Sequence, residues 1–135
     1  MSLQSDPADW KDLRHKEGVE GELAAKRYLQ RRGWQILEHR FRMGRLEIDL
    51  IARKDSLVAF VEVKTRFSVR FGTPFQAVTW GKQREITRVA QAWSDRHGRS
   101  SDTYRFDVIG ITRSREGLQR LEHLEDAFRA DRRGR

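Results

Sequence analysis

The segment Leu57–Lys64 (LVAFVEVK) constrains the fold of this chain more than any other feature. Its first five residues are all apolar and include Val and Phe, which favour strands. Such a run is typical of a central strand that is buried on both faces of a sheet. The segment then ends with Glu62 and Lys64, which share one face because side chains alternate along a strand. We therefore predict a sheet around this strand, with a charged site at the strand's carboxyl end.

The rest of the sequence predicts an α/β protein with a mixed sheet. Apolar side chains recur at helical spacing in Glu17–Arg32 and Lys82–His97, which we expect to be helices. The predicted strands are Trp34–Phe41, Leu46–Ala52, Leu57–Lys64, Tyr104–Ile111 and an edge strand at Leu118–Leu124, followed by a short turn at residues 126–128. The order is helix, three strands, helix, two strands.

A chain of 135 residues fits a single domain. We expect residues 1–16 to be loosely ordered and residues 17–128 to form the folded domain. Residues 129–135 (RADRRGR) are expected to form a basic tail.

Charge and composition narrow the classes of partner and site. The chain carries 28 Lys and Arg against 20 Asp and Glu, a formal charge of +8, so nucleic acid is the leading partner. A surface charged only for solubility is the alternative. The absence of cysteine excludes disulfides, thiolate metal sites and a cysteine nucleophile. No apolar run approaches the roughly 20 residues that span a bilayer, and we expect no signal peptide, so the expected location is the cytoplasm.

Two neighbouring strands bring acids toward one another. In Leu46–Ala52, Glu47 and Asp49 are expected on one face, with Leu46, Ile48 and Leu50 on the other. Asp49 and Glu62 would repel one another unless a cation or a proton lies between them. Mg²⁺ or Mn²⁺ suits this pair, because Mg²⁺ usually takes one or two carboxylates plus waters and phosphate. Lys64 would then orient or deprotonate a water. The alternative is an ordinary salt bridge between Lys64 and one of the two acids.

Three further groups of residues are candidates for the same site. Glu22 lies in the apolar arc of the first helix and points at the sheet, although a bond to a basic neighbour would also explain it. Lys82 and Gln83 begin the second helix, where they could meet a phosphate or simply form a solvated first turn. Asp107 could be a ligand but is better explained as a structural partner of an Arg. The same two explanations apply to Glu47.

Arginines and phenylalanines fall near these elements and suit phosphate contacts and base stacking. The Phe side chains are better explained as pinning their loop to the core. The residues concerned are Arg40, Arg42, Arg45, Arg66, Arg70, Arg84, Arg88, Phe67, Phe71 and Phe75.

Several motifs in a fixed order carry a family resemblance over about residues 17–128. They are G-x-x-G-E-x-x-A-x-x-Y-L from Gly18, E-I-D-L-I-A at 47–52, F-V-E-V-K-T-R at 60–66, F-G-x-P at 71–74, Lys82, R-F-D-V at 105–108 and D-A-F at 126–128. The sequence resembles the YraN family of small bacterial proteins. That family usually has Gly directly before E-I-D-L, where this chain has Leu46.

The resemblance implies a restriction-endonuclease-like fold of the PD-(D/E)xK superfamily, similar to archaeal Holliday-junction resolvases. Its typical αβββαβ core has a mixed sheet flanked by helices. By the same resemblance, Asp49 and Glu62 are the two metal-binding acids, Lys64 is the catalytic lysine and Glu22 is the helix-borne acid near the metal.

Two hypotheses about function follow, because a fold does not determine an activity. The first is a Mg²⁺- or Mn²⁺-dependent nuclease that hydrolyses phosphodiesters in structured or branched DNA, with Arg66, Lys82, Gln83 and Arg84 as nucleic-acid contacts. The second is a non-catalytic nucleic-acid-binding module whose acids are structural. An RNA-processing enzyme is a third possibility. Since resolvase-like relatives make two symmetric cuts as dimers, a homodimer is a candidate assembly.

Overall fold

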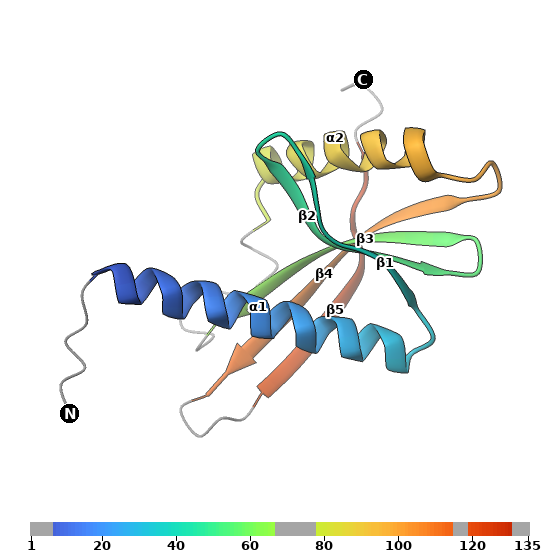
Figure 1. The fold of residues 1–135 in the computed structure, drawn as a ribbon. Helices are drawn as coiled ribbons and strands as arrows, with labels where there is room; N and C mark the ends of the chain where they lie inside the picture. Colours follow the sequence, from blue (N-terminus) through green and yellow to red (C-terminus); the bar gives the residue numbers. More distant parts are fainter. Residues whose placement is uncertain (1–6, 67–77, 115–118, 131–135) are drawn as a thin grey trace.

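The computed structural model describes the backbone of residues 7–66, 78–114 and 119–130, with side chains from Gly18 onward. The elements are α1 (Pro7–Arg31), β1 (Gln35–Met43), β2 (Leu46–Lys54), β3 (Leu57–Arg66), α2 (Trp80–His97), β4 (Thr103–Arg113) and β5 (Gln119–Phe128). Their order, which can be followed in Figure 1, confirms the predicted succession of helices and strands.

The five strands form one mixed sheet in the order β1-β2-β3-β4-β5. Only β3 and β4 are parallel, and the other neighbouring pairs are antiparallel. The central strand is β3, in which Val58, Ala59 and Val61 are fully buried and Phe60 is 2% exposed. The prediction of a central strand buried on both faces is confirmed.

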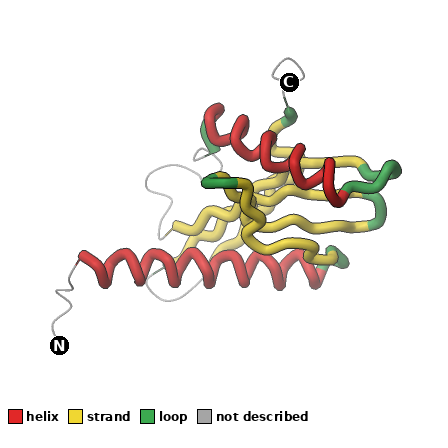
Figure 2. Tube along the Cα trace, turned by 45° about the horizontal axis from the view of Figure 1, so that its top comes forward, coloured by secondary structure: helices red, strands yellow, loops and turns green. Residues whose placement is uncertain are grey.

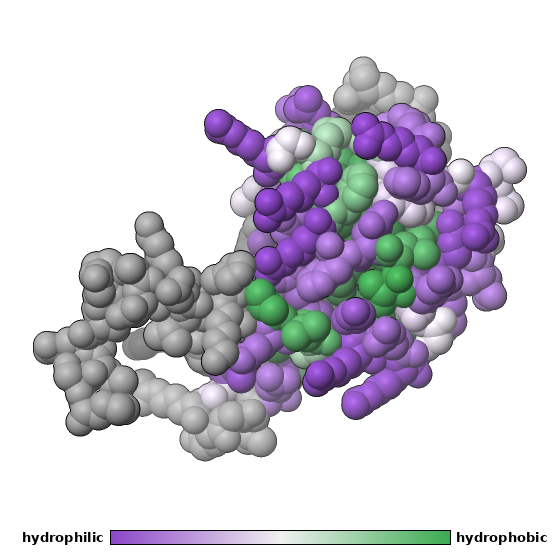
Figure 3. Space-filling view, viewed as in Figure 1, coloured by the Kyte–Doolittle hydropathy of each residue, from purple (hydrophilic) through white to green (hydrophobic). Residues whose placement is uncertain are grey.

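The two helices cover opposite faces of this sheet, as Figure 2 shows. The α2-side cluster consists of Ile48, Ile51, Val58, Phe60, Val78, Ile86, Val89, Ala90, Trp93, Phe106 and Val108. The α1-side cluster consists of Ala25, Leu29, Trp34, Leu50, Ala52, Ala59, Val61, Ile109 and Ile111. Hydrophilic side chains cover most of the molecular face seen in Figure 3. The fold is therefore an α/β sandwich of the predicted class.

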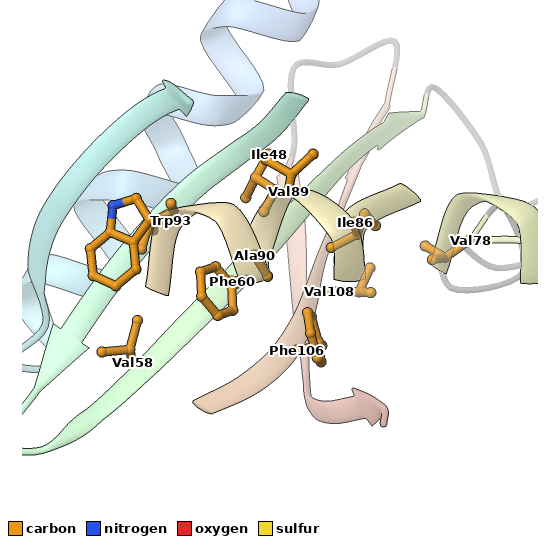
Figure 4. Packing of buried hydrophobic residues seen from close by; sticks show 11 residues of the cluster. Ile48, Val58, Phe60, Val78, Ile86, Val89, Ala90, Trp93, Phe106 and Val108 are labelled. Carbon is orange, nitrogen blue, oxygen red and sulfur yellow. The ribbon is translucent and has the colours of Figure 1, made fainter. Parts of the chain in front are cut away.

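Phe60 organises the α2-side cluster through its ring contacts (Figure 4). Its ring meets Trp93 edge to face, with 5.9 Å between centroids, and packs against Phe106 at 5.6 Å. The Trp93 indole donates a hydrogen bond to the Glu38 carboxylate at 3.0 Å, so its polar edge is satisfied at the rim of the core. These contacts fix α2 on the sheet.

Several details of the predicted helices and strands were wrong. Helix α1 begins at Pro7 rather than Glu17, in a polar stretch without the apolar periodicity that reveals a helix. Leu23, expected in the apolar arc of α1, is 37% exposed. The D-A-F motif at 126–128 lies within β5 rather than in a turn after it.

Among the residues that the structure describes, no helix has the length and apolar character needed to cross a membrane.

Truncation of Phe60 tests the packing of the core. We expect Phe60→Ala to lower the free energy of unfolding by about 3–5 kcal/mol, because it leaves a cavity between the sheet and α2. Leu124→Ala removes a side chain that is 39% exposed and should cost less than about 1 kcal/mol. Urea denaturation of both variants measures the difference, and equal losses would contradict this view of the core.

Candidate functional site

The site begins where β2 and β3 stop pairing. The last paired residues in their register are Leu50 and Val61, and the next residues along the two strands are Asp49 and Glu62. Beyond this point the Val63 N–H donates to the Asp49 carboxylate at 2.7 Å. A side chain thus takes over a backbone hydrogen bond, which holds Asp49 beside the carboxyl half of β3.

A change of face in β2 accompanies this divergence. Ile48 and Leu46 pack in or against the α2-side cluster, whereas Leu50 lies in the α1-side cluster. The prediction that all three share one face is therefore wrong for Leu50. The register places Asp49 opposite Arg40 of β1, whose φ of 57° is left-handed. Strict alternation holds only in regular strands, and β2 departs from it between Ile48 and Leu50, beside this left-handed residue.

Glu62 lies in the environment of the site that least favours a charged carboxylate. Its residue is 3% exposed, and its Oε1 is buried with no hydrogen-bond partner among the described residues. Burial, and then repulsion by Asp49, raise the Glu62 pKa to about 8, although Lys82 and Lys64 oppose the shift. Its Oε2 lies 4.0 Å from the Lys82 Nζ.

Asp49 shares this environment to a smaller degree. Burial raises its pKa to about 6, against the opposing effect of the Val63 N–H. The charge of Glu22 raises the Asp49 pKa further, and that of Lys64 lowers it. The two carboxyl groups therefore favour a proton or a cation between them at neutral pH.

Lys64 follows Glu62 on the same face of β3 and is partly exposed. Its charge acts on both acids, yet within the described part of the chain no carboxylate lies within 4.0 Å of its ammonium group. The alternative of a direct salt bridge between Lys64 and Asp49 or Glu62 is therefore wrong for this structure.

Glu22 reaches the site because α1 packs closely on the end of β3. A Cβ on the preceding Gly21 would lie 2.1 Å from the Thr65 Oγ1, so a larger residue there would force Thr65 to move. Glu22 is 6% exposed, as predicted for an inward-facing acid. Arg40 donates to both of its carboxylate oxygens, at 3.0 and 2.8 Å, and the His39 Nε2 lies 3.3 Å from one of them.

The structure therefore gives Glu22 the basic partners that the alternative required. Sequence reasoning missed this role of Arg40 and grouped it with phosphate-contacting arginines. No periodic pattern signals it, because the side chain projects from a residue with left-handed backbone.

The other two acids have structural partners. Glu47 accepts a 2.7 Å hydrogen bond from Arg42. Asp107 is 1% exposed and accepts from the Arg105 guanidinium at 2.8 and 2.9 Å, which confirms the expected Asp–Arg pair. Burial would raise the Asp107 pKa, but hydrogen bonds from His123 and Arg105 outweigh it and hold that pKa below its usual range.

The residues predicted to contact phosphate are dispersed. Lys82 joins the acidic pair, whereas the Gln83 amide donates to the Val78 carbonyl at 3.1 Å, just before the Thr79 cap of α2. Arg84 is exposed on α2, and Arg66 is partly buried at the end of β3. Phe67, Phe71, Phe75 and Arg70 lie outside the described residues.

The donor set suits a hard divalent cation with an incomplete protein shell. The described residues contain no group of three or more His, Asp or Glu side chains arranged to hold a metal ion. Two carboxylates are nevertheless what Mg²⁺ commonly takes from a protein, with water and phosphate oxygens filling its other positions. The Glu62 Oε1, which has no hydrogen-bond partner in the described part of the chain, is consistent with this fit.

Comparison with known proteins places the chain in a family. The model of the family described as "Uncharacterised protein family UPF0102" matches residues 21–111. The chain belongs to the UPF0102 (YraN) family. A UPF0102 protein of Chlorobium chlorochromatii is 47% identical over 82% of this chain and 89% of its own length. Those of Chlorobium phaeobacteroides and Geobacter sulfurreducens are 41% and 43% identical, over 96% and 82% of this chain and 100% and 87% of their own lengths.

The UPF0102 match includes Glu22, Asp49, Glu62 and Lys64, together with Lys82. The whole site therefore lies within the region that defines the family. Strand β5 lies beyond that region.

The stability of the metal-free protein should depend on the protonation of Glu62. Because its folded pKa is raised, the folded state keeps a proton that the unfolded state has released, so stability is lost as pH rises from the unfolded pKa toward about 8. Asp49 acts in the same direction up to about 6. We expect urea denaturation in a chelator to give a loss on the order of a few kcal/mol between about pH 6 and about pH 9.

Glu62→Gln removes the titrating group and should flatten this dependence. Glu85→Gln, at an exposed position on α2, is the matched control and should keep the wild-type slope. A wild-type slope in Glu62→Gln would contradict the assignment.

Proposed function

We propose that this chain is a metal-dependent nuclease that hydrolyses phosphodiester bonds in structured or branched DNA. The observation that carries the proposal is the pair of buried carboxylates, Asp49 and Glu62. Two lysines lie close by, and one Glu62 oxygen has no hydrogen-bond partner among the described residues. Buried acids held at raised pKa values are uncommon outside functional sites, because they destabilise the fold. The preference for branched DNA rests on the resemblance to archaeal Holliday-junction resolvases.

In this proposal Asp49 and Glu62 hold one Mg²⁺ or Mn²⁺ ion. When bound, such an ion would polarise a phosphoryl oxygen and lower the pKa of a water. The Val63 N–H fixes one oxygen of Asp49 and leaves the other available. Arg40 fixes Glu22, so that its charge stays beside Asp49 without competing for the same position.

Lys64 and Lys82 supply the positive charge of the proposed site. Lys64 is unpaired among the described residues, so its ammonium group can orient a water or balance charge that develops on a phosphodiester. Lys82 lies at the start of α2, 4.0 Å from Glu62, where it can meet a phosphate of the bound strand.

A non-catalytic nucleic-acid-binding module is the second candidate. The bidentate pairing of Glu22 with Arg40 favours it, because this pairing leaves only two acids for an ion. In that case the basic surface would bind nucleic acid in a salt-dependent manner, and divalent ions would have no effect.

Cleavage of labelled DNA separates the two candidates. Linear, single-stranded, flap and four-way-junction substrates are incubated with Mg²⁺ or Mn²⁺ and with wild type, Asp49→Asn or Lys64→Ala. Asn keeps an oxygen acceptor for the Val63 N–H, so the local fold should survive. We expect each variant to cut at least about 100-fold more slowly, and the junction or flap to be cut faster than linear duplex.

Glu85→Ala is the control for a general loss of negative charge and should cut like wild type. Cutting by Asp49→Asn at the wild-type rate would refute the proposed site. Binding without cutting by wild type in either metal would favour the binding module.

A further inference from the structure

A second charged feature lies outside the acidic site, between α1 and β5. We call a hollow of about 560 Å³ in this place the α1–β5 groove; it is lined by Ala24, Arg27, Tyr28, Arg31, Arg32, Gln119 and Leu121. Its size is within the range of ligand sites. None of these lining residues is acidic, so the groove is strongly positive.

The three arginines have no ion-pair partner in the described part of the chain. No carboxylate among those residues lies within ion-pair distance of Arg27, Arg31 or Arg32, whereas Arg113 at the end of β4 is paired with Glu20 at 2.9 Å. Arg27 and Arg31 are four residues apart on one side of α1, a spacing at which like charges repel. The groove therefore concentrates positive charge that the described part of the protein does not neutralise.

The wall of the groove is held in place from within. The guanidinium carbon of Arg32 lies 4.7 Å from the centre of the Tyr28 ring, and the Tyr28 hydroxyl is 3.0 Å from the His123 Nδ1. The other nitrogen of His123 is 2.7 Å from the Asp107 carboxylate, which Arg105 also grips. This network orients Arg32 and Tyr28 before any ligand binds, which lowers the cost of ordering them.

We infer that the α1–β5 groove is a second anion site, which binds the phosphate backbone of a nucleic-acid strand away from the acidic pair. Guanidinium groups match phosphate oxygens in two-pronged hydrogen bonds, and several of them in one hollow fit a ligand with several phosphates. Arg31 lies nine residues after Glu22 on α1, roughly 14 Å along the helix axis, so one strand segment need not occupy both places. This inference rests on the proposed function only in taking nucleic acid as the ligand.

Binding of a labelled duplex oligonucleotide in a chelator, over a series of salt concentrations, tests the inference without cleavage. The double variant Arg27→Gln/Arg31→Gln removes two groove charges. The control Arg96→Gln/Arg99→Gln removes two exposed charges, one in the last turn of α2 and one just after it. We expect the groove variant to bind about tenfold more weakly and its salt slope to fall by roughly two, with smaller changes in the control. Thermal melting checks that both variants fold.

Equal losses of affinity in the two double variants would overturn the groove, while wild-type cleavage would still support the acidic site. Conversely, weaker binding by the groove variant alone supports the groove even if no metal permits cutting. Pyrophosphate and a nucleoside triphosphate serve as competitors. Displacement of the oligonucleotide only at high competitor concentration supports a nucleic-acid backbone as the ligand. The opposite result is tight competitor binding that is lost in the groove variant while its oligonucleotide affinity stays unchanged. That result would overturn the nucleic-acid backbone as the ligand.

Discussion

The hydrogen bond from the Val63 N–H to the Asp49 carboxylate lies where β2 and β3 part, and the site depends on it. A sheet that continued its ladder past Leu50 and Val61 would use this N–H for a backbone carbonyl. Instead, β2 departs from strict alternation beside Arg40, whose backbone is left-handed, and the Asp49 carboxylate accepts a hydrogen bond from β3. The interruption of the ladder thus creates the space in which two carboxyl groups meet at the end of the central strand.

Around that space, some of the acids are paired with basic side chains and others are not. Arg40 and His39 hold Glu22, and Arg42 holds Glu47, so both acids have structural partners. Asp49 and Glu62 are left with the Val63 N–H and two lysines at longer range, which do not offset their burial. Since the surrounding acids are individually neutralised, the negative charge that lacks a close counter-ion is localised on Asp49 and Glu62. That localisation distinguishes a candidate cation site from a general network of surface salt bridges.

Much of this arrangement could be predicted from the sequence. The apolar run of β3 identifies the sheet centre, and its E-V-K ending places Glu62 and Lys64 on one face because strand alternation is strict in a regular strand. The facing of Leu50 could not be predicted, because β2 departs from strict alternation next to Arg40, a residue of the partner strand with positive φ. The hydrogen bonds from Arg40 to Glu22 could not be predicted either, because Arg40 is itself the residue with positive φ. The start of α1 at Pro7 could not be predicted, because the first turns of this helix lack the apolar periodicity that reveals a helix.

Calorimetric titration of the metal-free protein with Mn²⁺ tests the central claim, that Asp49 and Glu62 share one cation, most directly. Titrations at pH 7 in buffers of different ionisation enthalpy count the protons released. A carboxyl group with a pKa of about 8 must lose its proton to become a ligand, so we predict one ion per chain and release of close to one proton. Both should be lost in Glu62→Gln. Binding without proton release, or unchanged binding in that variant, would contradict the account.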